Sequence, residues 1–297
     1  MSLRMIESAM RVIDLINVAT EHLKAKGFDN SRLEVERLLG SVLGLSRIDL
    51  YMEFERLLAG NELVQFRLLC KRRLAHEPLQ HILGSAGFRE IEIKTDRRVF
   101  IPRPETEILV QTAVEFLKTR DEPLAADLGT GSGAIAISVA YEVPEAHIIA
   151  VDISDDALMI TAQNARKMGV EKCVTLVSGD MLDGLKSRGL FDAILSNPPY
   201  VKTHDIEQLQ PEIRDFEPVT ALDGGADGFK YLDSIAADAH MFLKPGGLLL
   251  LECEGEQAEK VKDKLETVSC YREIEIILDL AGKKRIVKAL LERKLNN

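Results

Sequence analysis

The chain has 297 residues, of which 46% are hydrophobic and 29% charged, so its length predicts about two domains and its composition is that of a globular protein. These values exclude an intrinsically disordered chain and a disulfide-stabilised miniprotein. The net charge of −10 is uneven, because residues 1–104 carry 17 Lys and Arg against 14 Asp and Glu, whereas the remainder carries 21 against 34. Nucleic-acid binding depends on many basic contacts to phosphate, so no stable nucleic-acid binding is expected.

Two further exclusions concern membranes and metals. No apolar run approaches the length of a membrane span, and no signal peptide is visible, so we expect a cytoplasmic protein without membrane contact. The four cysteines match no zinc or redox spacing, and no metal site is expected.

The first part of the chain is predicted to be helical. Up to about Leu83 the apolar residues recur at spacings of three and four, which places them on one stripe of successive amphipathic helices. Breaks that contain glycine, near residues 27–30, 44 and 60–61, separate these helices. We therefore predict a small all-α helical bundle over residues 1–83.

Between residues 84 and 104 the apolar period changes to two. A strand that ends at Ile93 leads into a turn at residues 95–98, and residues 99–101 return from it. This pattern predicts a β-hairpin linker over residues 84–104, which joins the helical domain to a second domain.

From residue 105 onward short apolar runs alternate with helical patterns. The predicted strands cover residues 125–128, 147–151, 174–177, 191–195, 247–253, 274–278 and 285–290. The predicted helices cover residues 106–119, 133–142, 155–168, 228–243 and 256–267. Crossovers of this length favour parallel pairing, so residues 105–297 are predicted to form an α/β domain with an open, mostly parallel, Rossmann-like sheet of seven strands. Ligands bind such sheets beyond the carboxyl ends of the strands.

A glycine-rich loop follows the first of these strands. It consists of Gly129, Thr130, Gly131, Ser132 and Gly133 and leads directly into a helix. Alternate glycines let the backbone turn sharply and let a ligand approach the main chain, which favours a nucleotide-like ligand. The third glycine follows the second by two residues rather than three, which disfavours NAD and FAD. A tight turn without a ligand is the alternative.

The next two strands end at further candidate residues. The second strand ends at Asp152, whose two carboxylate oxygens can accept the hydroxyls of a ribose, although a helix cap beside Ser154 is the alternative. Asp180 and Met181 follow the third strand. They can supply an acceptor for an adenine amino group and an apolar surface for its ring.

The fourth strand delivers Asn197, Pro198, Pro199 and Tyr200 to the same edge of the sheet. The two prolines fix the backbone and preorganise this loop, so that the Asn197 side-chain oxygen and the Pro198 carbonyl can each accept one hydrogen of a planar NH2 group. Tyr200 offers a flat face to such a group. A planar nitrogen is a poor nucleophile, so positioning and electrostatics must carry the rate of any transfer to it. Outside this setting the same four residues would be read as a turn alone.

These motifs together resemble a known class of enzymes. Residues 127–133, Asp152 and the pair at 179–180 are similar to the successive cofactor motifs of class I S-adenosylmethionine-dependent methyltransferases. The resemblance implies S-adenosyl-L-methionine as cofactor, with residues 129–133 at its methionine and ribose, Asp152 on the ribose hydroxyls, Asp180 or Met181 at the adenine, and Asn197 also in contact. The Asn-Pro-Pro-Tyr loop resembles the acceptor loop of methyltransferases that act on glutamine, adenine, cytosine or guanine nitrogens.

A second motif narrows the choice among these substrates. Residues 100–107 read Phe-Ile-Pro-Arg-Pro-Glu-Thr-Glu, after a helical domain and before the glycine loop. Over essentially the whole chain this order resembles the HemK/PrmC family, the protein-glutamine N5-methyltransferases of peptide chain release factors. The resemblance implies that residues 1–83 recognise the substrate and that residues 197–200 grip the glutamine of the Gly-Gly-Gln motif of class I release factors. Met181 stands where many relatives place an aromatic residue.

Several interpretations stay open. Arg103, Glu105 and Glu107 either order a segment that closes over the cofactor or provide a cap and helix-dipole charges for the helix that begins near Thr106. Basic residues either dock an acidic release-factor domain or form a solvated face; they are Lys71, Arg72, Arg73, Arg89, Lys94, Arg97 and Arg98.

Two rival functions remain beside glutamine methylation. A nucleic-acid amino methyltransferase would flip its base into the same pocket, and the acidic charge of residues 105–297 speaks against it. A non-catalytic scaffold that binds the cofactor and recruits partners is disfavoured because Asn197 and the glycines are intact.

Overall fold

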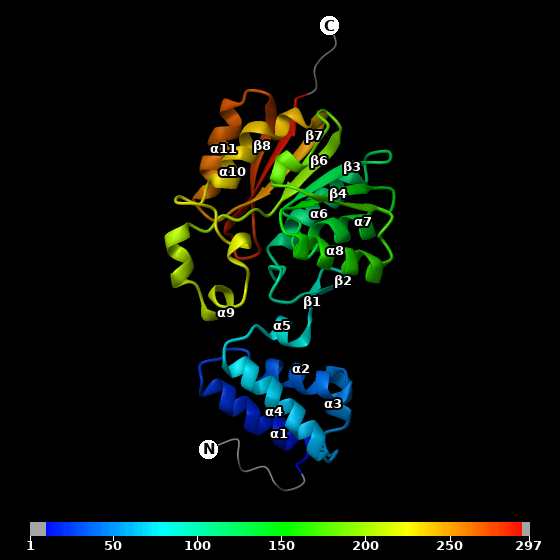
Figure 1. Cartoon of the computed structure of the whole chain (residues 1–297), viewed down its shortest axis with the longest axis vertical. Coiled ribbons are helices and arrows are strands. Elements are labelled where there is room, and N and C mark those ends of the chain that lie inside the picture. Colours follow the sequence, from blue (N-terminus) through cyan, green and yellow to red (C-terminus); the bar gives the residue numbers. More distant parts are fainter. Residues whose placement is uncertain (1–9, 293–297) are drawn as a thin grey trace. The chain divides into compact units, whose positions relative to one another are not determined.

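The computed structural model describes residues 10–292, which form two compact units with their boundary between Gly84 and Ser85 (Figure 1). The predicted domains over residues 1–83 and 105–297 extend at their outer ends into residues 1–9 and 293–297, which lie outside the described residues.

The first unit is the helical bundle that the apolar spacing predicts. Its helices are α1 (Val12–Lys24), α2 (Ser31–Leu43), α3 (Arg47–Met52), α4 (Gly60–Leu74) and α5 (Leu79–Leu83). Their apolar stripes meet in one core, in which Leu15, Leu38 and Phe66 are almost fully buried. Removing such side chains from water is the main source of stability, at roughly 1.5–3 kcal/mol each.

A β-hairpin opens the second unit, but it differs from the predicted one. Its strands are β1 (Ser85–Phe88) and β2 (Ile91–Lys94), joined at Arg89, whose φ of 49° is left-handed. A turn does occur within residues 95–98, where the Val99 N–H donates to the Asp96 carbonyl at 3.1 Å, but it is not the turn of the hairpin, and the predicted returning strand at 99–101 is wrong. Val99 is buried because it packs on α8 (Asp155–Met168), not because it pairs in a sheet.

The sheet of the second unit confirms the predicted architecture. Its strands are β3 (Leu124–Leu128), β4 (His147–Asp152), β5 (Val174–Ser178), β6 (Phe191–Ser196), β7 (Leu243–Glu252), β8 (Tyr271–Leu278) and β9 (Lys284–Leu291). They lie in the order β5-β4-β3-β6-β7-β9-β8, and all neighbours pair in parallel except β9, which is antiparallel to β7 and β8. The result is an open, mostly parallel sheet of seven strands.

Helices cover both faces of this sheet (Figure 1). On one face α6 (Thr106–Leu117), α7 (Ala134–Glu142) and α8 enclose one core, and on the other α10 (Lys230–Asp238) and α11 (Gln257–Thr267) enclose a second. Neighbouring strand residues divide between the two cores: Leu195 of β6 belongs to the first and Ile194 to the second. Both are fully buried, which explains why the strands read as continuous apolar runs.

The strand order places the functional loops together. From β3 the chain proceeds outward to β4 and β5, and it then returns to add β6 on the other side of β3. The loops after β3 and β6 thus flank the crevice where the strand order reverses, which is where such sheets bind ligands. After β6 come short helices, including α9 (Pro211–Arg214). None of the helices within residues 10–292 combines the length and apolarity that crossing a membrane requires.

Candidate active site

The loop after β3 turns on glycines with left-handed backbone angles. Gly129, Gly131 and Gly133 have φ values of 71°, 58° and 81°, which other residues adopt only with strain. A Cβ on Gly133 would lie 2.7 Å from the side chains of Ile137 and Thr161, so this glycine lets the chain enter α7 close against α8. The loop therefore exposes backbone, rather than side chains, to the crevice.

Asp152 at the end of β4 is held by two backbone amides. Its Oδ2 accepts from the N–H of Gly131 at 2.8 Å, and its Oδ1 accepts from the N–H of Ser154 at 2.9 Å. Burial raises the pKa of this carboxyl, and the backbone hydrogen bonds oppose that rise. Each oxygen keeps a further lone pair for a hydroxyl donor. Ser154, not Asp152, caps α8 by accepting from the N–H of Ala157.

Met181 lies against the glycine loop. It follows β5 with a φ of 47°, and its terminal methyl group is 3.3 Å from the position that a Cβ on Gly129 would take. Asp180 and Met181 both line the crevice. The structure thus places an acceptor and an apolar group beside the loop, as the strand endings predict.

The residues from Asn197 to Tyr200, which we call the elbow, are fixed from several sides. The Asn197 Nδ2 amide donates to Oγ1 of Thr106 at 3.1 Å, and Gln257 donates to the backbone carbonyl of Tyr200 at 2.9 Å. Gly224 packs so closely that a Cβ there would come within 2.7 Å of the Tyr200 Cα. Among the described residues no donor reaches Asn197 Oδ1 or the Pro198 carbonyl, so both oxygens remain for an incoming group.

One cavity of about 350 Å³ brings these groups together, entirely within the second unit. The predicted site residues that line it are Gly129, Thr130, Gly131, Ser132, Asp152, Asp180, Met181, Asn197, Pro198, Pro199 and Tyr200. Gly133 does not line it, because its place is the turn into α7. The elbow and the glycine loop therefore share one chamber, as their places after β6 and β3 predict.

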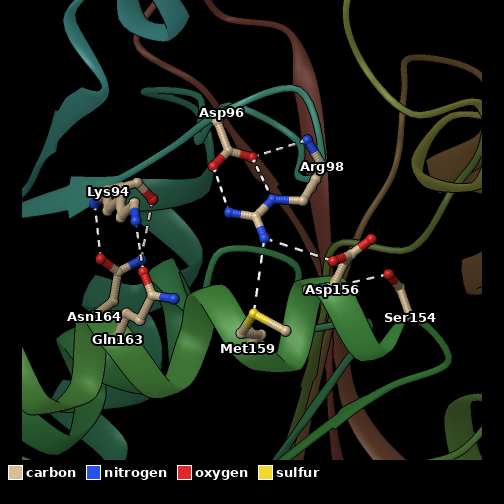
Figure 2. A network of polar contacts seen from close by, with 9 residues as sticks. Lys94, Asp96, Arg98, Ser154, Asp156, Met159, Gln163 and Asn164 are labelled. Atoms are coloured by element: carbon tan, nitrogen blue, oxygen red, sulfur yellow. Dashed lines mark hydrogen bonds and ion pairs between the residues drawn. The ribbon is translucent and has the colours of Figure 1, made fainter.

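Residues 95–104, which we call the strap, supply another wall of this cavity. Figure 2 shows how the end of β2 and the start of the strap are tied to α8: Lys94 of β2 contacts Gln163 and Asn164, and Arg98 of the strap lies between Asp96 and Asp156. Phe100, further along, lines the cavity. Polar contacts with one helix thus hold a segment that has no regular secondary structure.

The strap also joins the segment after β6, which contains α9. Arg103 Nη2 pairs with Glu217 Oε1 at 2.7 Å, and the Arg97 guanidinium lies over the Phe216 ring at 5.3 Å. Glu217 is 5% exposed, and burial raises its pKa to about 7, while Arg103 opposes the rise. Arg103 therefore acts in ordering the walls of the cavity rather than in capping α6.

The two acidic residues that flank Thr106 behave differently from Arg103. Glu105 stands at the N-cap position of α6, but its side chain makes no capping hydrogen bond. Glu107 lies in the first turn, where its Oε1 accepts from the backbone N–H of Arg89 at 3.0 Å. It thus fastens the hairpin turn to α6. The interpretation as a side-chain cap is wrong for Glu105.

The basic residues proposed as a docking surface are largely committed to the fold. Arg73 is only 3% exposed and pairs with Glu34 at 2.7 Å, so it is neither a docking residue nor part of a solvated face. Four others are held by neighbours in their own unit: Arg72 by Glu77, Arg89 by Glu142, Lys94 by Gln163 and Arg98 by Asp96. These contacts stabilise local structure.

Sequence reasoning missed three polar residues that line the cavity or support it. Glu252 lines the cavity at the carboxyl end of β7, but the predicted strand extends to residue 253, so the rule that singled out Asp152 at a strand end did not mark it. Thr106 supports Asn197, and no local signal marks this contact across 91 residues. Glu217 follows no regular strand and carries no signal either. Within residues 10–292 no group of three or more His, Cys, Asp or Glu side chains is arranged to hold a metal ion.

Comparison with known proteins identifies the family. Residues 14–84 match the PrmC N-terminal domain, and residues 91–213 match the methyltransferase small domain. A release factor glutamine methyltransferase from Rhodopirellula baltica is 38% identical over 280 residues, which cover 93% of this chain and 95% of the relative. The chain belongs to the release factor glutamine methyltransferase family. Another member, from Geobacter sulfurreducens, is 42% identical over 243 residues, covering 81% of this chain and 83% of its own.

One solved structure agrees with this chain on the fold. A methyltransferase from Pyrococcus furiosus is 19% identical to this chain and superposes with a TM-score of 0.50, over 77% of this chain and 98% of its own. Membership of the release factor glutamine methyltransferase family makes the chain a methyltransferase, and it confirms the resemblance to which the Arg-Pro-Glu-Thr-Glu and Asn-Pro-Pro-Tyr motifs point.

Proposed function

We propose that this enzyme transfers a methyl group from S-adenosylmethionine to the side-chain nitrogen, N5, of the glutamine in the Gly-Gly-Gln motif of class I peptide chain release factors. The observation that carries the proposal is the shared cavity, in which the two open acceptor oxygens of the elbow stand with the glycine loop. The names of the relatives support a release factor as the substrate. We also propose that the helical unit recognises this protein.

The residues around the glycine loop fit S-adenosylmethionine. Left-handed glycines at 129 and 131 leave a cradle of bare backbone, and Asp152, already oriented by two amides, has lone pairs left for the ribose hydroxyls. Asp180 and Met181 line the same cavity and offer an acceptor and an apolar contact for the amino group and ring of an adenine. When bound, S-adenosylmethionine supplies an electrophilic methyl group on a sulfonium sulfur.

The elbow meets the chemical problem that a carboxamide nitrogen poses. Its lone pair is delocalised into the carbonyl, so the NH2 group must be polarised and aimed before it can attack. Asn197 Oδ1 and the Pro198 carbonyl can each accept one N–H hydrogen, which draws charge toward the nitrogen and fixes its plane. Pro198 and Pro199 hold these oxygens in place with little conformational entropy left to lose. No covalent nucleophile is required.

The proposal is tested by locating the methyl group that the enzyme transfers. Purified enzyme is incubated with S-adenosylmethionine that carries a labelled methyl group and with a class I release factor, with the same factor whose Gly-Gly-Gln glutamine is replaced by alanine, or with duplex DNA. We expect label only in the unmodified factor, and fragment mass analysis should place the labelled methyl group on that one glutamine. Label in DNA, or equal label in the alanine-substituted factor, contradicts the proposal.

A further inference from the structure

Asn197 is held by a side chain from a distant part of the sequence. Its Nδ2 amide donates to Oγ1 of Thr106 at 3.1 Å, and Thr106 is the first residue of α6 and only 4% exposed. Beyond Thr106 lies Glu252 at the end of β7, close enough that the Thr106 hydroxyl lowers the pKa of its carboxyl. The three side chains therefore form one line that leads from the elbow to the end of β7.

Glu252 is costly to bury and is not explained by packing. It is 2% exposed, lines the cavity, and its Oε2 has no hydrogen-bond partner among the described residues. Buried polar atoms without partners are rare in folded proteins, and those that occur call for an explanation. We take its nearness to Thr106 as that explanation, because Thr106 in turn contacts Asn197.

The negative charge of an ionised Glu252 determines which way the Thr106 hydroxyl points, and through Thr106 it determines how the Asn197 amide is oriented. A carboxylate only accepts, so a Thr106 hydroxyl that turns its single hydrogen toward an ionised Glu252 has only lone pairs left for Asn197. The Asn197 amide must then turn its NH2 toward Thr106 and its Oδ1 away from it. With Glu252 protonated, the Thr106 hydroxyl is free to rotate, and the Asn197 amide can flip.

We propose that Thr106 and Glu252 are positioning residues, which keep Asn197 Oδ1 turned toward the acceptor nitrogen. This inference rests on the proposed role of Asn197 in holding that nitrogen. It gives the Pro-Glu-Thr-Glu segment a function, since Thr106 is the member of that segment that contacts the elbow.

The surroundings of Glu252 set the pH at which this control acts. The ionisable groups that face it are Arg285 of β9, Arg103 of the strap, Glu105 before α6 and Tyr200 of the elbow. Burial raises the pKa of Glu252 to about 7; Thr106 and the two arginines oppose the rise, whereas Glu105 adds to it. Turnover should therefore increase as the pH rises through about 7.

The first test separates the Thr106 hydroxyl from the Thr106 packing. Thr106→Val keeps the shape and removes the hydroxyl, and we expect kcat for release-factor methylation to fall about 10- to 100-fold while the KM values change little. Thr106→Ser restores the hydroxyl and should recover most of kcat. Thr112→Val is the matched control, because Thr112 lies on the same helix and bonds only to the Ile108 carbonyl. A kcat of Thr106→Val within twofold of wild type, or equal loss in Val and Ser, overturns the inference.

The second test uses pH. Wild-type kcat should show an acidic limb near pH 7, and Glu252→Gln should abolish this limb because the amide has no proton to lose there. Glu275→Gln, on the exposed pair with Lys288, is the control and should keep the limb. An unchanged pH profile in Glu252→Gln contradicts the role of Glu252.

A third readout does not depend on the substrate. In enzyme labelled with 15N-asparagine, the side-chain amide signal of Asn197, assigned by its loss in Asn197→Ala, should shift with pH near 7 and stop shifting in Glu252→Gln and Thr106→Val. If the wild type transfers no methyl group to a release factor, the proposed function fails, while this signal still decides the positioning contact. If the pH dependence of the Asn197 signal is unchanged in both variants, the positioning contact is refuted.

Discussion

Arg103 and Glu217 pair at 2.7 Å although 114 residues separate them in the chain, and the pair joins the strap to the segment after β6 on the rim of the candidate active site. The strap itself is irregular, so its position depends on such contacts. Removing one partner of an ion pair that has a buried member destabilises the fold, because the remaining charge is then uncompensated.

We therefore expect Arg103→Ala to lower the free energy of unfolding by about 2 kcal/mol at pH 8, less than for a fully buried pair because Arg103 is partly exposed. The loss should shrink at pH 5.5, where Glu217, with a pKa of about 7, is protonated and needs no partner. Urea unfolding at both pH values measures this. Arg272→Ala removes an exposed pair with Glu273 and should cost less than about 1 kcal/mol, and less still at high salt, which screens exposed charges. Equal losses at the two pH values would contradict the assignment.

Asp152 should govern cofactor affinity. Substitution by alanine removes two oxygens that the backbone has already oriented, so the Kd for S-adenosylmethionine should rise about 10- to 100-fold, the equivalent of one or two hydrogen bonds to a charged group. Isothermal titration calorimetry measures the change. Asp155→Ala, at the first residue of α8 and outside the cavity lining, serves as the comparison. A Kd within twofold of wild type in Asp152→Ala would remove this residue from the cofactor site.

Asn197 should govern turnover instead. Asn197→Ala deletes one of the two open acceptors of the elbow, and we expect kcat to fall by at least about 100-fold, as when a preorganised transition-state contact is lost. The Kd for S-adenosylmethionine should stay within a few-fold, because the glycine loop and Asp152 are untouched. Single-turnover methylation assays together with calorimetry separate the two effects. An unchanged methylation rate in Asn197→Ala would contradict this assignment.

The elements and most of the site follow from local patterns, and the failures have identifiable causes. Buried strands read as apolar runs, and residues after strand ends, such as Asp152 and Asn197, fall at one edge in any parallel sheet. The hairpin turn carries no glycine or asparagine signal, because Arg89 itself adopts the left-handed conformation there. Contacts with Glu107 and Glu142, which are distant in sequence, stabilise that turn.

Contacts between distant segments account for what could not be predicted. Val99 looks like a strand residue but is buried by α8, and a period of two cannot distinguish these environments. The partner of Asn197 lies 91 residues away and that of Arg103 lies 114 residues away. Contacts between residues so far apart in sequence produce no periodic pattern that a single sequence would reveal. The support of the site, unlike its motifs, is therefore visible only in the folded chain.

Gly133 should matter for folding more than for ligand contact. Alanine at this position has to adopt a φ of 81° and place its Cβ 2.7 Å from Ile137 and Thr161. Gly169→Ala is the matched control, since Gly169 has a φ of 72° and open space around it. We expect about 1 kcal/mol of destabilisation from the backbone alone in Gly169→Ala and about 1–3 kcal/mol more from crowding in Gly133→Ala. Equal destabilisation would show that the neighbours of Gly133 give way freely.

Stability should depend on pH through three buried carboxyl groups. Burial raises the pKa values of Asp127, Glu217 and Glu252 to about 7 each, whereas in the unfolded chain such groups titrate near about 4. Between these values the folded chain holds more protons than the unfolded chain, so stability falls as pH rises, by up to about 1.4 kcal/mol per pH unit for each group. Carboxyls with lowered pKa, such as Asp96, act only below this window.

We accordingly expect the Tm of the ligand-free enzyme to be higher at pH 6 than at pH 8, and Glu217→Gln to reduce the difference by removing one of the three groups. Thermal unfolding in buffers of equal ionic strength measures both. A Tm that rises between pH 6 and pH 8 would contradict the raised pKa values. If Glu252 also positions Asn197, ionisation of this one carboxyl lowers stability and raises turnover over the same pH range, so the buried charge that orients the acceptor site is itself destabilising.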